Sequence, residues 1–169
     1  MPLVIKYTGA AQTFLDASLN PADTRLTADA EAKGSFGATR AQLIIKFSLI
    51  SPPTGVSNED GCGPNEFTLA MDYTRSITTF KDHSQMFVFW DTGMMCSTPG
   101  PAGMASYRGW ADGHIVGGTG RFEGTTGTVH TDFGGYDLSG PFVYEGPPFP
   151  SFGSFSGIVD GKVFFPHHR

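Results

Sequence analysis

The sequence predicts one all-β domain over residues 1–169, folded as an eight-stranded antiparallel β-barrel. Three observations favour this fold. No segment shows the apolar period of a helix of normal length. Many short runs instead alternate apolar and polar residues, as strands with one buried face do. The chain is also rich in residues of tight turns and packed sheets, with 23 glycines, 12 prolines and 15 phenylalanines. Closure is the usual way for such a sheet of about eight to ten short strands to remove its edges.

The first part of the chain predicts the weakest elements. Residues 3–15 alternate loosely and predict one or two short strands around Gly9. Residues 16–33 are polar and interrupted by an Asn-Pro pair, so we expect a connection with at most a brief helical turn over 27–33. Two glycines within residues 34–37 then predict a corner.

Two clear strands follow. Residues 41–50 carry an apolar side chain at every second position. Residues 67–73 repeat the pattern, which places Met71 and Tyr73 on the same face. Residues 51–65 are rich in proline and glycine and predict a long loop between these strands.

Residues 76–80 and 85–90 flank a four-residue turn and predict a β-hairpin. The second arm, Met86–Trp90, is apolar on both faces. In a barrel, one of these faces would line the lumen, and a loop or a second subunit would cover the other. Residues 93–103 predict a further long loop.

The strand predicted over residues 105–116 has two different faces. The face opposite Tyr107 carries Arg108, Trp110, Asp112 and His114. Five glycines follow between positions 117 and 127, and residues 126–133 then alternate as a strand. Such a glycine cluster predicts a tight corner between two strands of a curved sheet. A phosphate-binding loop is not favoured, because Glu123 stands where its third glycine is required and no helical pattern follows.

The end of the chain predicts a long connection and a last hairpin. Residues 136–150 contain four prolines and predict a connection with room for one short strand. Residues 155–159 and 162–165 flank Asp160-Gly161, the strongest hairpin signal in the chain.

The run Gly117-Gly118-x-Gly120-x-Phe122-Glu123-Gly124-x-x-Gly127-x-Val129 resembles the corner shared by plant allene oxide cyclases and dirigent proteins. The segment 153–159 resembles the closing strand of that family, and the similarity extends over about residues 104–165. The resemblance implies a calycin-like barrel in which a reactive small molecule is cyclised or isomerised without a cofactor. Resembling cyclases also present a glutamate on the first strand. Residues 3–15 contain none, so that part of the mechanism is not carried over.

Charge and composition exclude several functional classes. The formal net charge is −5, and the 11 Lys and Arg are scattered rather than clustered, which argues against a nucleic-acid partner. No apolar run approaches the roughly 18 residues of a membrane-spanning helix. The N-terminus lacks the basic and apolar segments of a signal peptide. Localisation stays unknown: as given, the chain is expected in the cytoplasm, and a processed secreted form is the alternative.

Cys62 and Cys96 both lie among turn residues. One disulfide would join two loops, whereas a cytosolic protein would keep two unlinked thiols, and the sequence leaves both readings open. No C-x-x-C or His-x-x-x-His spacing occurs. We therefore expect no metal, and the resemblance implies that no cofactor is used.

Function in such a barrel depends on the polar groups that reach an apolar lumen. Tyr73 and Arg108 are the candidate catalytic residues. Tyr73 could donate a hydrogen bond to a carbonyl or epoxide oxygen, or could be a core tyrosine with its hydroxyl at the rim. Arg108 could stabilise a developing oxyanion, with Trp110 as a wall, or could lie outside the barrel over Trp110. The resemblance supports a pocket role, because Arg108, next to Tyr107, occupies the offset at which the cyclases carry an aromatic pocket residue.

His130 and Asp132 share one strand face. They have the spacing of an oriented general base, or else simply form the solvated side of the strand. The candidate substrate-binding residues are Phe47, Met71, Phe89, Trp90, Tyr107, Trp110 and His130.

We therefore expect a cofactor-independent isomerase or cyclase of the pericyclase-like kind, which acts by holding one hydrophobic molecule in a reactive conformation within the barrel lumen. One alternative is a non-catalytic barrel that binds a lipid or pigment. Another is a dirigent-like homo-oligomer, a dimer or trimer, that guides a coupling reaction. The enzyme prediction requires a hollow lumen, and a bore filled by its own phenylalanines would contradict it.

Overall fold

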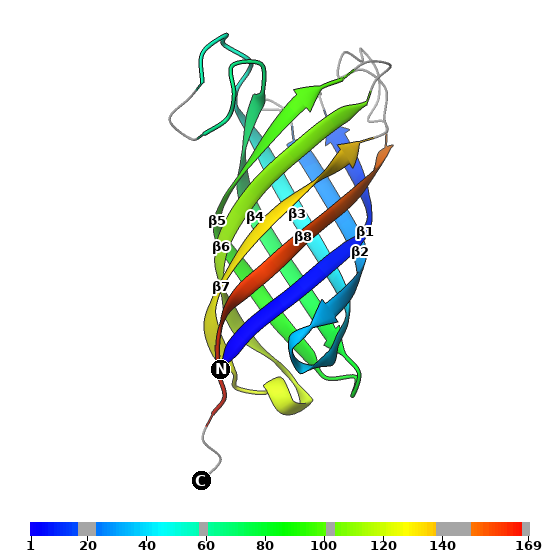
Figure 1. Ribbon diagram of the computed structural model, residues 1–169, viewed down its shortest axis with the longest axis vertical. Helices are drawn as coiled ribbons and strands as arrows, with labels where there is room; N and C mark the ends of the chain where they lie inside the picture. The colour runs from blue at the N-terminus through cyan, green and yellow to red at the C-terminus, as the bar shows by residue number, and fades with distance from the viewer. Residues whose placement is uncertain (17–22, 58–60, 101–103, 138–149, 167–169) are drawn as a thin grey trace.

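The computed structural model describes residues 1–16, 23–57, 61–100, 104–137 and 150–166. They form a closed antiparallel barrel in which each strand pairs with its neighbours along the chain and the first strand pairs with the last (Figure 1). The strands are β1 (Pro2–Asp16), β2 (Asp23–Gly34), β3 (Ala38–Ser51), β4 (Phe67–Phe80), β5 (Gln85–Pro99), β6 (Ala105–Thr119), β7 (Thr126–Asp137) and β8 (Pro150–Phe164). The predicted all-β barrel is confirmed. The described residues contain no helix with the length and apolar character needed to cross a bilayer.

The prediction for residues 16–33 is wrong, because residues 23–34 form β2. The inner face of this strand carries the buried side chains of Leu26 and of three alanines, Ala28, Ala30 and Ala32. Alanine alternating with charged residues carries little strand propensity, so pairing with β1 and β3 determines the conformation. Gly9 does not separate two short strands but lies inside a single long β1. A Cβ there would come 2.1 Å from the Asp29 carbonyl oxygen, so this glycine permits the close approach of β2.

The hairpin predicted at Asp160-Gly161 is also wrong, since β8 continues through both residues. Asp160 pairs with Val4 on one side and His130 on the other. A Cβ at Gly161 would lie 2.2 Å from the Thr128 carbonyl oxygen, so this glycine permits close strand contact instead of a turn. The loop predicted over residues 93–103 is shorter than expected, because β5 extends to Pro99. Most of the predicted connection 136–150 lies outside the described residues.

The glycine-rich corner does join two strands, β6 and β7, as predicted. It contains a short 3-10 helix, η3 (Gly120–Phe122). Gly117, Gly120 and Gly124 have φ values of 127°, 59° and 68°, which side chains with a Cβ rarely adopt. The corner thereby turns Phe122 inward, where its side chain is fully buried.

Phe122 is the centre of a cluster of four phenylalanines. The cluster belongs to the end of the barrel where η3 and the turn between β4 and β5 lie, the lower end in Figure 1. We call this cluster, Phe36, Phe80, Phe122 and Phe165, the phenylalanine plug. The Phe122 ring centroid lies 4.4 Å from that of Phe80, 5.9 Å from that of Phe36 and 5.7 Å from that of Phe165. The Arg121 guanidinium lies over the rings of Phe80 and Phe122.

Candidate functional site

The lumen above the phenylalanine plug contains a cavity of about 60 Å³. Its wall is mostly apolar and is formed by inward-facing side chains of the strands, among them Ile5, Ile45, Met95, Phe133 and Phe155. No charged side chain of the described residues lines it. The bore is thus partly filled, and the space that remains is small and uncharged.

Four of the predicted substrate-binding residues line this cavity: Phe47, Met71, Trp90 and Tyr107. Phe47, Met71 and Trp90 are at most 8% exposed. Their placement follows from the period of two along β3, β4, β5 and β6, which sends alternate side chains inward.

Tyr73 lies on the outer wall and is 42% exposed, so its predicted face is wrong. Phe47 pairs with Met71, but the preceding residue Lys46 pairs with Tyr73, so β4 holds one extra residue there. This β-bulge reverses the alternation, which leaves Met71 inside and Tyr73 outside. The Tyr73 hydroxyl is therefore not positioned to donate into the lumen.

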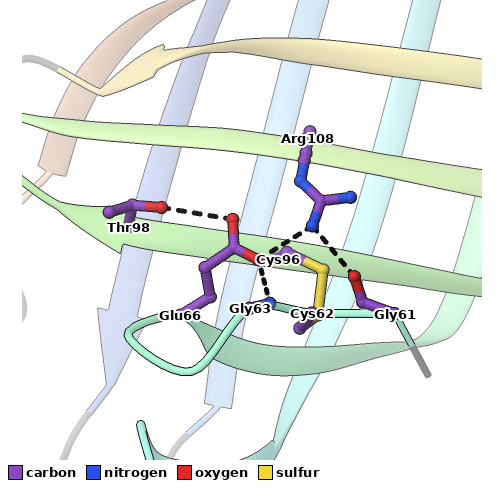
Figure 2. Close-up of polar contacts among 7 residues, drawn as sticks. All are labelled: Gly61, Cys62, Gly63, Glu66, Cys96, Thr98 and Arg108. Atoms are coloured by element: carbon purple, nitrogen blue, oxygen red, sulfur yellow. Dashed lines mark hydrogen bonds and ion pairs between the residues drawn. A yellow bond between two sulfur atoms is a disulfide. The ribbon is translucent and has the colours of Figure 1, made fainter. Parts of the chain in front are cut away.

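Arg108 and Trp110 share a face, as predicted, and that face is the outer wall. Arg108 Nη2 donates to the Gly61 carbonyl oxygen and to Glu66 Oε2, each at 2.9 Å (Figure 2). Both acceptors belong to the segment 61–66, which we call the strap. Arg108 therefore fastens a loop to the outside of the barrel and does not reach the cavity.

A disulfide between Cys62 and Cys96 fastens the strap to β5, so the bridged reading of the two cysteines is the one found (Figure 2). Glu66 accepts further hydrogen bonds from the Gly63 N–H and the Thr98 hydroxyl. Partial burial opposes ionisation of Glu66, but these hydrogen bonds and Arg108 outweigh it and lower the pKa of the carboxyl. The strap is thus held by a disulfide and by an ionised carboxylate, Glu66, that accepts several hydrogen bonds.

Phe89 and His130 also lie on the outer wall. Phe89 precedes the inward Trp90, so the alternation turns it outward, where it packs against Tyr73 and Arg75. His130 Nδ1 lies 2.7 Å from Asp112 Oδ1, and its Nε2 lies 3.6 Å from Asp132. The hydrogen bond with Asp112 raises the pKa of His130. This imidazole belongs to a solvated charge pair outside the barrel, so it does not bind a molecule in the lumen.

Several polar groups in the lumen were missed as site residues. Tyr7 Oη and Thr131 Oγ1 lie 2.9 Å apart, and burial raises the pKa of Tyr7 to about 12. Trp90 Nε1 donates to Ser76 Oγ at 3.0 Å. Tyr7 follows Leu3 and Ile5 at every second position, so the alternation of residues 3–7 already indicated its inward face.

Two further lumen groups differ in how their hydroxyls are bonded. The Tyr107 hydroxyl donates to the Ser154 carbonyl oxygen at 3.1 Å, and burial raises the pKa of this phenol. The Thr74 hydroxyl is buried and has no hydrogen-bond partner among the described residues. It lines the cavity. The sequence contained no signal for this unpaired group, because its inward direction depends on the bulge.

A second hollow, of about 410 Å³, lies on the outside of the barrel beside the strap. Its wall is partly polar and includes Arg108, Gly134, Tyr136, Ser154 and Ser156. It is larger and more open than the lumen cavity, whose wall is more strongly apolar. Mostly apolar hollows with a few polar groups are the usual sites for small molecules, so the lumen is the stronger candidate.

The chemistry that these groups support is limited. The strap offers one set of metal-ligand types, Cys62, Glu66 and Cys96, whose ligand atoms lie within 4.8 Å of one another. Metals bind the thiolate form of cysteine, whereas these two sulfur atoms form a disulfide, so neither cysteine offers a thiolate ligand. In the lumen, the hydroxyls of Tyr7 and Thr131 are neutral donors, and no carboxylate or imidazole of the described residues accompanies them. The site can therefore enclose a molecule and donate neutral hydrogen bonds to it.

Comparisons of the chain with protein-family models, with curated proteins and with solved structures found no significant match.

Proposed function

We propose that this protein binds one small, largely apolar molecule in the lumen of its barrel. The observation that supports this proposal is the lumen cavity above the phenylalanine plug, whose wall is mostly apolar and carries no charged side chain of the described residues. Burial of apolar surface would supply most of the affinity. The few hydroxyls in the wall would orient the guest.

The cavity volume restricts the guest. Drug-sized ligands occupy sites of about 300–1,000 Å³, against about 60 Å³ here. The guest is therefore no larger than one compact ring. Met71 and Met95 both line the cavity, and their unbranched side chains can shift to admit a ring of this size.

Intrinsic fluorescence tests the proposal, because one of the two tryptophans lines the cavity. Trp90 is 7% exposed, whereas Trp110 is 36% exposed on the outer wall. A Trp110→Phe variant leaves Trp90 as the only tryptophan. We expect a saturable change in its emission on titration with toluene. Saturation transfer from the protein to toluene, followed by NMR, gives an independent readout.

Matched variants locate the binding. Ala41→Phe and Leu43→Phe each place a ring in the cavity wall and should abolish the response to toluene. Tyr73→Phe and Arg108→Met change the outer wall and should leave it intact. Circular dichroism verifies that each variant is folded. The proposal fails if toluene does not bind, or if folded cavity-filling variants bind it as well as the parent.

A second candidate function is the cofactor-free isomerase or cyclase. The Tyr7 hydroxyl favours it, since a neutral phenol beside Thr131 is a fixed donor in an apolar wall. Such a donor could stabilise an oxygen that gains negative charge during a unimolecular ring closure. Tyr73 and Arg108 lie outside the lumen and are not part of this proposal.

Turnover separates the two functions. A small divinyl ketone closes to a cyclopentenone without gain or loss of atoms, and the protein should accelerate this closure above the buffer rate. Tyr7→Phe should then lower the rate constant by about 100-fold, the lower range for a positioned proton donor. Binding of the ketone without acceleration would leave only the binding function.

The third candidate function is a dirigent-like homo-oligomer, which requires an apolar outer surface at which subunits associate. Phe87 and Phe89 face outward from β5 and are partly exposed, which is the doubly apolar arm noted in the sequence. Light scattering at several protein concentrations tests it. A monomer throughout would contradict this option and leave the other two unaffected.

A further inference from the structure

Thr74 is a buried hydroxyl without a partner in the wall of the lumen cavity. The side chain is 2% exposed, and its Oγ1 has no hydrogen-bond partner among the described residues. A buried hydroxyl that loses its water and gains no partner is destabilising. A valine would occupy almost the same space without this cost, so the unpaired hydroxyl requires an explanation.

The neighbours of Thr74 do not supply the missing bond. Its partners in register are Ile45 on β3 and Trp90 on β5. Ile45 has no polar side-chain atom, and the Trp90 N–H donates to Ser76. On other strands, the Tyr7 and Thr131 hydroxyls bond to each other. The available partner for Thr74 must therefore come from the cavity itself.

Water alone is a poor occupant beside this hydroxyl. The cavity volume of about 60 Å³ could hold several waters, since each needs about 10–15 Å³. A stable buried water also needs two to four polar partners. The residues that flank Thr74 in register are apolar on their cavity side, as is most of the wall. An apolar molecule with a single oxygen would satisfy the hydroxyl and fill the remaining space with carbon.

We infer that the guest of the lumen is a small apolar molecule with one acceptor oxygen, a ketone or ether, to which the Thr74 hydroxyl donates. This inference rests on the proposed function, because it specifies the class of molecule bound at the same site. Thr74 is then the residue that orients the guest. The donor is neutral, so binding does not require a charged ligand.

The test compares cyclohexanone with methylcyclohexane, which have similar size and differ in the oxygen. Binding of each is followed through the emission of Trp90 in the Trp110→Phe background. Thr74→Val removes the hydroxyl at nearly constant shape. We expect it to weaken cyclohexanone binding by about three- to tenfold, as for one hydrogen bond, and to leave methylcyclohexane binding unchanged or stronger.

Thr78→Val is the matched control, since Thr78 lies in the same cavity wall on the same strand. It should leave the ratio of the two affinities unchanged. An equal loss of cyclohexanone binding in Thr78→Val would overturn the assignment to Thr74. If both compounds bind and Thr74→Val alters neither, this inference fails while the proposed function holds. If neither binds the parent protein, the proposed function fails.

Thermal unfolding of the ligand-free protein provides a second readout. An unpaired hydroxyl destabilises the folded chain, so Thr74→Val should raise the melting temperature in the absence of any guest. A lower melting temperature with normal circular dichroism would show that the hydroxyl already has a partner in the folded chain. That outcome would overturn the inference.

Discussion

Tyr7 and Thr131 are 124 residues apart in the chain, yet their hydroxyl oxygens lie 2.9 Å apart inside the barrel. Tyr7 belongs to β1 and Thr131 to β7, and β8 lies between these strands. The Tyr7 ring can cross β8 because the residue it passes is Gly157. This hydrogen bond therefore spans the seam at which the two ends of the chain close the sheet.

Gly157→Ala should weaken the barrel at this seam. The added Cβ would lie 2.3 Å from Tyr7 Oη and 2.5 Å from the Asp132 carbonyl oxygen, and the backbone oxygen cannot move aside without distorting β7. We expect a loss of about 1–3 kcal/mol in the free energy of unfolding, as for other overpacked interiors. Urea denaturation measures it. Ser156→Ala, at an exposed neighbouring position, is the control and should change this free energy by less than about 0.5 kcal/mol.

Alkaline pH should destabilise the protein through Tyr7. Burial raises the pKa of this phenol from 10.0 to about 12, and the unfolded chain ionises at the lower value. The stabilisation is thus complete below pH 10 and is lost as the pH rises towards 12, by about 2–3 kcal/mol over the whole interval. Tyr7→Phe lacks this loss, so the difference in stability between parent and variant should shrink above pH 10. Ultraviolet difference titration of the two proteins isolates the phenol, and ionisation near pH 10 would contradict the burial argument.

How far the fold could be predicted depends on which interactions determine each segment. The faces of residues 105–116 and the corner at 117–127 were predictable, because alternation and glycine conformation are local properties. The strand at 23–34 and the continuous β8 were not. Residues 160 and 161 form a favourable local turn pair, but pairing with strands on both sides keeps them extended.

In the candidate site, too, the features set by local alternation were predictable and those set by contacts between strands were not. Phe47 and Trp90 were correctly expected to line the lumen, because buried and more exposed side chains alternate without a break along residues 41–47 and 86–90 of their own strands. Tyr73 was misplaced by one extra residue in β4, and nothing in the composition of residues 71–74 marks that bulge. The contact between Arg108 and Glu66 joins distant segments, and no sequence period could indicate it.

Removal of the disulfide should destabilise the fold through the strap. Cys62 and Cys96 are separated by 34 residues, and loop-closure entropy for that length corresponds to about 3–4 kcal/mol. The double substitution Cys62→Ser and Cys96→Ser should lower the free energy of unfolding by up to that amount. Amide hydrogen exchange should also quicken in residues 61–66, while the lumen strands keep their protection. Equal stability of the reduced and oxidised parent proteins would show that Glu66 and Arg108 alone hold the strap.

The phenylalanine plug should be the largest single contribution of side-chain packing at the closed end. Phe122 is 0% exposed and contacts the rings of the other three phenylalanines, so Phe122→Ala should cost about 3–5 kcal/mol. Phe164→Ala is the matched control, because that ring is 57% exposed and its loss should cost little.

If Phe122→Ala does not fold, Phe122→Leu keeps much of the volume and should retain the fold at a smaller cost. Urea denaturation of each variant measures the change. The plug also holds Phe36 at a φ of 59°, an unfavourable conformation for a bulky residue, so its loss should free the corner at 35–37 as well. Faster hydrogen exchange in that corner, together with the loss of stability, would identify the plug as the element that seals this end. Equal costs for Phe122→Ala and Phe164→Ala would contradict that role.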